Sequence, residues 1–512
     1  MKEIQLFAVI DLGASAIRMV IAEQKQKKPY TIIESLSQSI RLGVDTFLHS
    51  YISPESAVAT VRILKKFKRI LNDYQVNDIR VVATSAVNEA RNRGLFLDYV
   101  FRNTGFHIEA IESQETCKMI FLSICNELAR AKEELAPNTL LVDLGTGNAR
   151  TVFIKDGKMV WVQSLKLGSL RLREILSDID VQSFEFHKVL QAFVKADIDL
   201  MKKLRPFPQI DLFIATGSVI GDMMRYLTPQ LAHRTFHKVS TDWFFQIFDK
   251  YKNVTIEQFV EDLQIPLETA DILLPAIIVY WYYAKTFNPA NVIITESSLA
   301  EGVVINKFQP IENFEEHILA SARSLVNKFE SDEFHANNVL EIATKIFEQT
   351  HALHKLNNDY LLILKVAALL HDVGHFINDR QHHKHSQYLI TGSPITGLTE
   401  RQRTLVALVA RNHRHYPLNL ESVRSFESSN KEKTSLTKLA AILRIANALD
   451  KSHLGCVRDL KLKYKKDRQQ LIFKVTTSTN LSLEKWAFMH STDLFSKVFF
   501  VDCTLVEKRE LQ

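Results

Sequence analysis

Residues 11–20 read DLGASAIRMV, and residues 143–152 read DLGTGNARTV. The two stretches lie 132 residues apart, and five of their ten positions coincide: Asp, Leu, Gly, Arg and Val. An apolar run precedes each copy and another follows it, a pattern typical of a strand, a tight loop and a second strand. A glycine two residues after the aspartate lets backbone N–H groups approach an anion, because no Cβ intervenes. The repeat therefore predicts two related hairpins that hold a phosphate chain from both sides.

Length and composition indicate an ordinary globular protein of several domains. The 512 residues exceed a typical domain of about 100–200 residues three- or fourfold. The net charge of +6 fits either a solvated surface or the attraction of a polyanion, and charge alone does not decide between them. The basic runs are short, so we expect no specific nucleic-acid partner.

The cysteines and apolar segments indicate the compartment. The four cysteines are scattered without a CxxC pair, as expected of free thiols in a reducing environment. The N-terminus does not resemble a signal peptide, and the longest apolar stretch, residues 272–284, is too short to span a bilayer. We expect a cytoplasmic protein that has no membrane partner.

The order of strand and helix patterns predicts an α/β fold followed by a helical domain. Strands alternate with helices in two similar halves, residues 1–125 and 126–308. The apolar spacing is helical over residues 309–456, and β-rich runs return in a small α/β region, residues 457–512.

Several motifs carry a resemblance to a known family. A doubled Asp-x-Gly loop in duplicated halves resembles the actin, sugar-kinase and Hsp70 superfamily, whose fold is ribonuclease H-like. More locally, the chain resembles the exopolyphosphatase and guanosine-pentaphosphatase (Ppx/GppA) family. The matching motifs occur in family order at residues 8–13 (AVIDLG), 81–87 (VVATSAV), 143–145 (DLG), 167–172 (LGSLRL), 213–218 (FIATGS) and 299–302 (LAEG).

The resemblance implies an activity and a set of site residues. It implies a phosphohydrolase that releases terminal phosphate from inorganic polyphosphate or from pppGpp, a guanosine pentaphosphate, and a homodimer by analogy. Such chemistry needs donors around phosphate, a cation, and a carboxylate that orients water. Glu115 and Asp143 are the implied catalytic residues, and Asp11 and Asp143 are expected to hold Mg²⁺ or water. The implied phosphate-binding residues are Asp11, Gly13, Ser15, Gly145, Thr146, Gly147 and Asn148.

The chain departs from the family pattern at four places. The first loop usually continues Ser-Asn-Ser, and here residues 14–16 read ASA; the second usually reads GGGS, and here residues 145–148 read GTGN. Asn88 stands where the family has Arg, and the family's Glu-Glu pair is Glu115-Thr116, so either residue can align with the catalytic Glu. Loss of an arginine that stabilises the transferring phosphate costs on the order of 10³-fold in rate. Two interpretations stay open: retained hydrolysis, or a regulatory protein that binds polyphosphate or an alarmone without turnover.

A second constellation lies in the helical region. More than half of the eighteen histidines fall between residues 335 and 415, around the sequence HDVGH at 371–375. An adjacent His-Asp pair with an upstream His resembles the metal site of HD phosphohydrolases, in which a divalent cation lowers the pKa of bound water. We predict His335, His371 and Asp372 as ligands of a cation such as Mn²⁺ or Fe²⁺.

The remaining ligands of this predicted metal site follow from the same resemblance. Members usually have Ile-Ala-Asp where residues 445–447 read IAN, and Asp450 lies on the same helical face. His385 and His413 match the extra positions of larger HD sites. An alternative function is therefore a metal-dependent phosphohydrolase in the HD-like domain, with a degenerate N-terminal domain that serves as a sensor.

Overall fold

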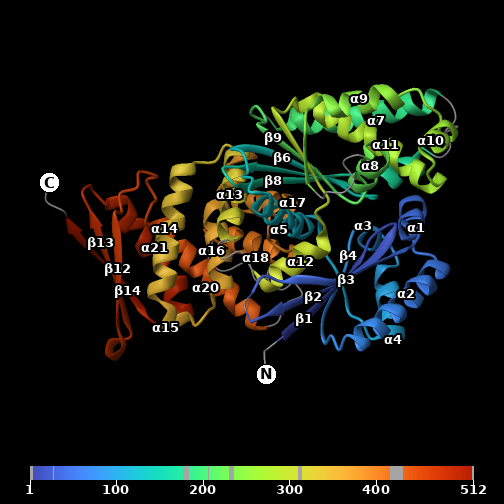
Figure 1. Ribbon diagram of the computed structural model, residues 1–512. Coiled ribbons are helices and arrows are strands. Elements are labelled where there is room, and N and C mark those ends of the chain that lie inside the picture. Colours follow the sequence, from blue (N-terminus) through green and yellow to red (C-terminus); the bar gives the residue numbers. More distant parts are fainter. Residues whose placement is uncertain are drawn as a thin grey trace. The chain divides into compact units, whose positions relative to one another are not determined.

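The protein folds into two compact units, Met1–Glu312 and Asn313–Gln512. The structure is a computed structural model that describes residues 4–26, 28–176, 184–205, 207–229, 236–309, 314–414 and 430–509. In Figure 1 the first unit runs from blue to yellow and the second from yellow to red. The predicted division at residues 125 and 456 stays a prediction.

The first half of the first unit is built on a five-stranded sheet in the order β3-β2-β1-β4-β5. β1, β2 and β3 are antiparallel neighbours, whereas β4 lies parallel to β1 and β5 parallel to β4. The strands are β1 (Ile4–Leu12), β2 (Ala16–Lys25), β3 (Thr31–Ser39), β4 (Asp78–Ala83) and β5 (Ile108–Ala110). The helices are α1 (Leu42–His49), α2 (Pro54–Asp73), α3 (Ser85–Asn88), α4 (Arg93–Thr104) and α5 (Ser113–Ala131).

Local sequence explains why α2 begins where it does. Ser53 caps the helix by accepting a hydrogen bond from the Ser56 N–H, and Pro54 occupies the first turn, where its missing N–H costs nothing. Its apolar side chains Leu64, Phe67 and Leu71 are buried in the core of this half, as expected of an amphipathic helix on one face of a sheet.

The second half repeats the strand order of the first. Its six-stranded sheet runs β8-β7-β6-β9-β11-β10, with three antiparallel strands first and parallel strands after them. Only the antiparallel edge strand β10 has no counterpart among the described strands of the first sheet. The strands are β6 (Asn138–Leu144), β7 (Ala149–Lys155), β8 (Lys158–Leu165), β9 (Leu212–Thr216), β10 (Phe236–Val239) and β11 (Asn291–Thr295).

Helices complete the second half and return the chain to the first. They are α6 (Ser169–Ile175), α7 (Phe184–Leu204), α8 (Ile220–Leu227), α9 (Asp242–Tyr251), α10 (Ile256–Leu263), α11 (Leu267–Phe287) and α12 (Leu299–Phe308). α12 packs against the first half: Glu301 accepts hydrogen bonds from Ser123 Oγ and Tyr30 OH, both at 3.1 Å. A Cβ on Gly302 would stand 1.8 Å from the Met119 carbonyl oxygen, so α12 and α5 cross at a distance that only glycine permits.

The second unit consists of helices followed by a small sheet. The helices are α13 (Phe314–Lys328), α14 (Glu333–Gln349), α15 (His351–His354), α16 (Asn358–Leu370), η2 (Val373–Phe376), α17 (His382–Gly392), α18 (Glu400–Arg411) and α20 (Asn430–Ala448). The sheet has the order β12-β13-β14 and comprises β12 (Asp459–Lys465), β13 (Gln470–Thr477) and β14 (Asp502–Arg509), with η3 (Lys466–Arg468) and α21 (Ser482–Phe499) between strands.

Two surface properties bear on the predicted partners. Within the described ranges, no single helix is both long and apolar enough to cross a membrane; α10 and α11 meet the criterion only together, and they are bent by 108°.

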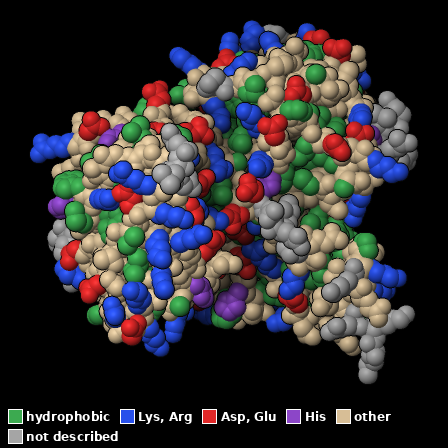
Figure 2. Space-filling view, turned by 90° about the vertical axis from the view of Figure 1, so that its left-hand side faces the viewer, with side chains coloured by type: hydrophobic (Ala, Val, Ile, Leu, Met, Phe, Trp, Pro, Cys, Tyr) green, Lys and Arg blue, Asp and Glu red, His purple; other side chains and the backbone are tan. Residues whose placement is uncertain are grey.

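On the face drawn in Figure 2, Lys and Arg side chains are spread widely, and Asp and Glu side chains lie among them. The net charge of +6 therefore forms no unbroken basic band on that face.

Candidate functional site

The two repeat loops line one pocket in the first unit. The pocket is a cavity of about 240 Å³, and its lining includes Gly13 and Ser15 from the first loop and Gly145 and Asn148 from the second. The carboxyl ends of the parallel strands also reach it, through Thr84 after β4, Gly217 after β9 and Glu296 after β11. Ligands of open α/β sheets bind at such strand ends. Every residue predicted to bind phosphate contributes to this lining: Asp11, Gly13, Ser15, Gly145, Thr146, Gly147 and Asn148.

Each hairpin places an arginine opposite its aspartate. Asp11 pairs with Arg18 across β1 and β2, and Asp143 pairs with Arg150 across β6 and β7. In the second hairpin, Arg150 Nε and Nη2 both lie 2.6 Å from Asp143 Oδ2. These side chains are only 12% and 4% exposed, so the ion pair is largely buried. The matching offset in the two sequence copies is the signal that could have identified both arginines.

The loop glycines donate their amide N–H groups within their own loops and lie close to these arginines. The Gly13 N–H donates to the Ala16 carbonyl and the Gly145 N–H to the Asn148 carbonyl, each at 3.0 Å. A Cβ on Gly13 would stand 3.7 Å from Arg18 Nη1, and one on Gly145 would stand 3.5 Å from Arg150 Nη2. In this structure both amides close their own loops, and the role of Gly13 and Gly145 in phosphate binding stays a prediction.

A buried arginine fixes the second loop from outside. Arg171 Nε donates to the Gly147 carbonyl at 2.6 Å, and its Nη2 donates to Asn148 Oδ1 at 3.2 Å and to Glu89 at 2.7 Å. Its guanidinium stacks over the Phe47 ring, 3.9 Å from the centroid. A Cβ on Gly168 would stand 2.1 Å from the Gly147 carbonyl carbon, so the start of α6 packs directly on the loop. Because Glu89 and Phe47 belong to the first half, Arg171 also joins the two halves.

Asp11 is the pocket carboxylate with an unused oxygen. The residue is 7% exposed, and its Oδ1 has no hydrogen-bond partner among the described residues. Burial raises the pKa of Asp11 above its ordinary value of 3.8; nearby Arg18 and Arg150 counteract this shift, and Asp143 adds to it. A buried carboxylate of this kind can accept a proton from water near neutral pH.

The structure places the predicted catalytic Glu115 outside this pocket lining. Glu115 lies in the first turn of α5 and forms an ion pair with Arg80 Nη2 at 2.8 Å; the same nitrogen lies 2.7 Å from Glu109. Thr116, the alternative position, is buried and donates to the Glu112 carbonyl. The catalytic role of Glu115 stays a prediction; in this structure its carboxylate forms an ion pair with Arg80 on β4. Glu296 is the pocket acid that sequence reasoning missed, although its position directly after a buried strand was a usable signal.

Comparisons with known proteins agree with this fold. A solved Ppx/GppA family member from Aquifex aeolicus is 24% identical, with a TM-score of 0.50 over 60% of this chain and 98% of that one. An exopolyphosphatase from Cytophaga hutchinsonii is 18% identical, with a TM-score of 0.53 over 60% of this chain and 99% of that one. These likenesses confirm the predicted actin-like pair over the matched part of the chain, and the structure itself shows the helices and small sheet that follow it.

Sequence comparison identifies the family. The model described as the Ppx/GppA phosphatase family matches residues 20–310, and the model described as Ppx/GppA phosphatase, domain III, matches residues 319–492. Curated relatives include guanosine-5'-triphosphate,3'-diphosphate pyrophosphatases. The one from Pseudoalteromonas atlantica is 23% identical over 86% of each chain, and the one from Vibrio cholerae is 22% identical over 94% of this chain and 95% of that one. The chain belongs to the Ppx/GppA phosphatase family.

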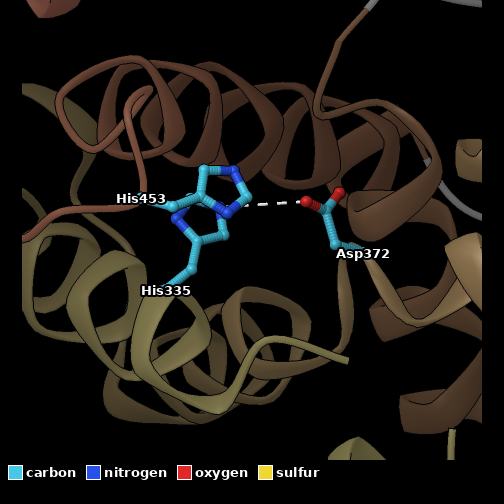
Figure 3. Close-up of side chains that lie close together, drawn as sticks. All are labelled: His335, Asp372 and His453. Carbon is cyan, nitrogen blue, oxygen red and sulfur yellow. Dashed lines mark ion pairs between the residues drawn. The ribbon is translucent and has the colours of Figure 1, made fainter. Parts of the chain in front are cut away.

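A second candidate site is the histidine cluster of the second unit. Asp372 lies within ligand distance of two groups of side chains that can hold a metal ion: His335 with His453, and His382 with His413. His335 and His371 Nε2 lie 3.8 and 3.5 Å from Asp372 Oδ2, while His382 and His413 Nε2 lie 3.4 and 3.3 Å from Oδ1. The two oxygens of one carboxylate therefore face two separate sets of imidazoles. Figure 3 shows Asp372 pointing toward the His335 ring, which stacks on His453.

Hydrogen bonds at the Nδ1 atoms of two histidines show that the Nε2 atoms of these rings, which face the Asp372 carboxylate, carry no proton. His371 Nδ1 and His413 Nδ1 lie 2.7 and 2.6 Å from backbone carbonyls, which only accept, so each Nδ1 carries the proton. Burial lowers the pKa of His371 to about 4 and that of His413 well below its ordinary value. Both rings are therefore neutral at pH 7, and each Nε2 presents a lone pair. Buried Nε2 atoms of His335 and His371 have no hydrogen-bond partner in the described chain. A cation between these lone pairs and Asp372 would satisfy them.

Three of the six predicted metal ligands, His371, His385 and Asp450, lie outside these two groups. Asp450 Oδ2 is 2.8 Å from His335 Nδ1, and its Oδ1 accepts the Gly455 N–H, also at 2.8 Å. This corrects the assignment of Asp450, which orients His335 instead of facing the cluster. His385 is in neither group, whereas His382 and His453 were missed. The spacing of His382 three residues before His385 made the two indistinguishable from sequence.

Proposed function

We propose that the chain removes terminal phosphate from inorganic polyphosphate or from pppGpp in the pocket between the repeat loops. The observation that carries this proposal is the shared pocket, in which two Asp-Arg hairpins meet. The names of the curated relatives and of the solved exopolyphosphatase support the two substrate classes. A homodimer and a cytoplasmic location stay predictions.

Asp11 and the two pocket arginines have different roles in the proposed hydrolysis. Asp11 Oδ1, which has no hydrogen-bond partner among the described residues, accepts a hydrogen bond from the attacking water and takes its proton. Arg18 and Arg150 line the same pocket and stabilise charge on the phosphoryl oxygens. The P–O–P bond breaks, the water oxygen joins the terminal phosphorus, and the shortened phosphate chain leaves as the anion.

Mg²⁺ was expected between Asp11 and Asp143, and it stays a prediction. The oxygen ligands that Mg²⁺ prefers include one or two carboxylates. Asp11 has an unused oxygen, but Asp143 is held by Arg150, so the two acids do not fit a cation held jointly by both.

Phosphate release tests the proposal. The protein is assayed with polyphosphate, pppGpp and ATP, and a colorimetric reagent quantifies phosphate. Polyphosphate or pppGpp is expected to release phosphate at about 1 s⁻¹ or faster, whereas a ligand that raises the melting temperature without turnover would favour the sensor alternative. Because Glu115 lies outside the pocket lining, Glu115→Gln is expected to retain the parent rate within about threefold. A much larger loss would restore Glu115 to the site.

The pKa of Asp11 determines how the activity falls at acidic pH. A general base works when deprotonated, so activity should fall as pH drops through the Asp11 pKa, which lies above 3.8. Arg150 lowers this pKa, so Arg150→Gln should move the acidic limb to higher pH. The measurement is kcat/KM against pH for both proteins. An acidic limb that stays in place, or moves to lower pH, would contradict the assignment of Asp11.

A second candidate function belongs to the helical unit. We propose that the histidine cluster binds a divalent transition metal, such as Mn²⁺ or Fe²⁺, and supports metal-dependent phosphoester hydrolysis. The partnerless Nε2 atoms of His335 and His371 favour this function. A cation there would lower the pKa of a bound water and supply hydroxide near neutral pH. Elemental analysis of protein purified without a metal column tests it, and protein free of transition metal even after incubation with Mn²⁺ would contradict it.

A further inference from the structure

The pocket of the first unit contains its own positive charges. Its lining includes three acids, Asp11, Asp143 and Glu296, and two arginines, Arg18 and Arg150. A phosphate chain is repelled by the carboxylates and must be held by a cation. That cation is either a bound metal or a guanidinium, and the two possibilities make different demands on Asp143.

Asp143 already forms an ion pair with the guanidinium of Arg150. Two nitrogens of Arg150 lie 2.6 Å from one oxygen of Asp143, in an ion pair that is almost completely shielded from water. A metal that took this carboxylate would remove the directly paired counter-charge of a buried guanidinium, which is unfavourable. The protein therefore favours the pair as it stands.

The arginine keeps donors for a ligand. A guanidinium carries five N–H groups in a planar fork that matches phosphate oxygens, and contact with one carboxylate oxygen uses only part of them. Arg150 Nη2 lies beside Gly145, 3.5 Å from the place where a Cβ would stand. Arg18 occupies the equivalent place over Gly13, so the pocket has a guanidinium in each half.

We propose that Arg150, together with Arg18, serves as the built-in cation of this pocket, so that it binds a phosphate chain without a divalent metal. The inference rests on the proposed function, because it concerns the same pocket and the same class of ligand. It replaces the predicted Mg²⁺ with a side chain of the protein.

Calorimetric titration with tripolyphosphate, in EDTA and again in Mg²⁺, tests the inference on the full chain. The parent Kd is expected to agree within about threefold between the two conditions. Arg150→Gln should weaken binding in EDTA by about tenfold or more, the effect of losing one charge-assisted contact. Arg150→Glu should bind weakly in EDTA and recover in Mg²⁺, because it sets two carboxylates side by side.

Controls separate a local effect from misfolding or a general loss of charge. Arg102→Gln removes an exposed arginine from α4 and should leave the Kd within about twofold. If Arg150→Gln melts at a much lower temperature than the parent, Arg18→Gln carries the test and should weaken binding in EDTA by about fivefold or more. Parent protein that binds tripolyphosphate only in Mg²⁺, or a folded Arg150→Gln that binds as tightly as the parent, would overturn the inference.

The inference and the proposed function fail separately. Binding in EDTA that depends on Arg150, without phosphate release from any substrate, would support the built-in cation and reject hydrolysis. Phosphate release that requires Mg²⁺ and is indifferent to Arg150→Gln would support hydrolysis and reject the built-in cation.

Discussion

Replacement of Asp11 by Asn is expected to lower phosphate release by about 10²- to 10⁴-fold, the usual contribution of a positioned general base. The amide has the same shape as the carboxylate but takes no proton from water. Because Asp11 Oδ1 has no hydrogen-bond partner in the described chain, the substitution breaks no contact at that atom. The fall should appear in kcat rather than in KM, since the affected group acts on the water and not on the bound phosphate.

Steady-state phosphate release with the preferred substrate measures this effect, and the melting temperature confirms that the variant folds. Asp98→Asn is the matched control, because it removes an exposed carboxylate of the same unit at α4. A folded Asp11→Asn protein that releases phosphate at the parent rate would show that another group activates the water. Glu296, which lines the same pocket, would then be the next residue to replace.

Replacement of Asp372 by Asn is expected to weaken metal binding in the second unit, with affinity falling by about tenfold or more. The reason is that one carboxylate serves both groups of histidines, one oxygen to each. The amide keeps the volume but loses the negative charge and one oxygen ligand. A histidine replaced in one group, such as His413, should lower metal content less than Asp372→Asn does.

Metal content per chain after incubation with Mn²⁺ and desalting measures the effect of Asp372→Asn. His385→Ala provides the matched control, because this histidine lies between His382 and His413 in sequence but belongs to neither group. Metal retained in full by Asp372→Asn would refute the shared role of the carboxylate. Metal lost from His385→Ala would instead favour the ligand set predicted from sequence.

The sequence predicted the parts of the site that depend on local pattern. The repeat at residues 11–20 and 143–152 placed Asp11 and Asp143 in related hairpins, because strand and loop patterns are short-range properties. The same repeat contained Arg18 and Arg150 at matching positions. Their importance was not recognised, because the ion pair that defines it forms across two strands.

The contacts that the sequence could not predict join distant segments. The direction of the Glu115 side chain is set by Arg80, 35 residues earlier on β4. The role of Asp450 is set by His335, 115 residues away. In the histidine region, the composition predicted that histidines gather around Asp372. The choice between His382 and His385 depends on how α17 packs, which residue spacing alone does not determine.

The close packing of Gly168 on Gly147 has a consequence for engineering this protein. The second phosphate loop takes its shape partly from a segment that follows it by about twenty residues, and Arg171 fastens it there. A transplant of residues 143–152 alone into another hairpin would contain the motif but would lack the start of α6, which supports the loop. A transferable module has to extend through the first turn of α6.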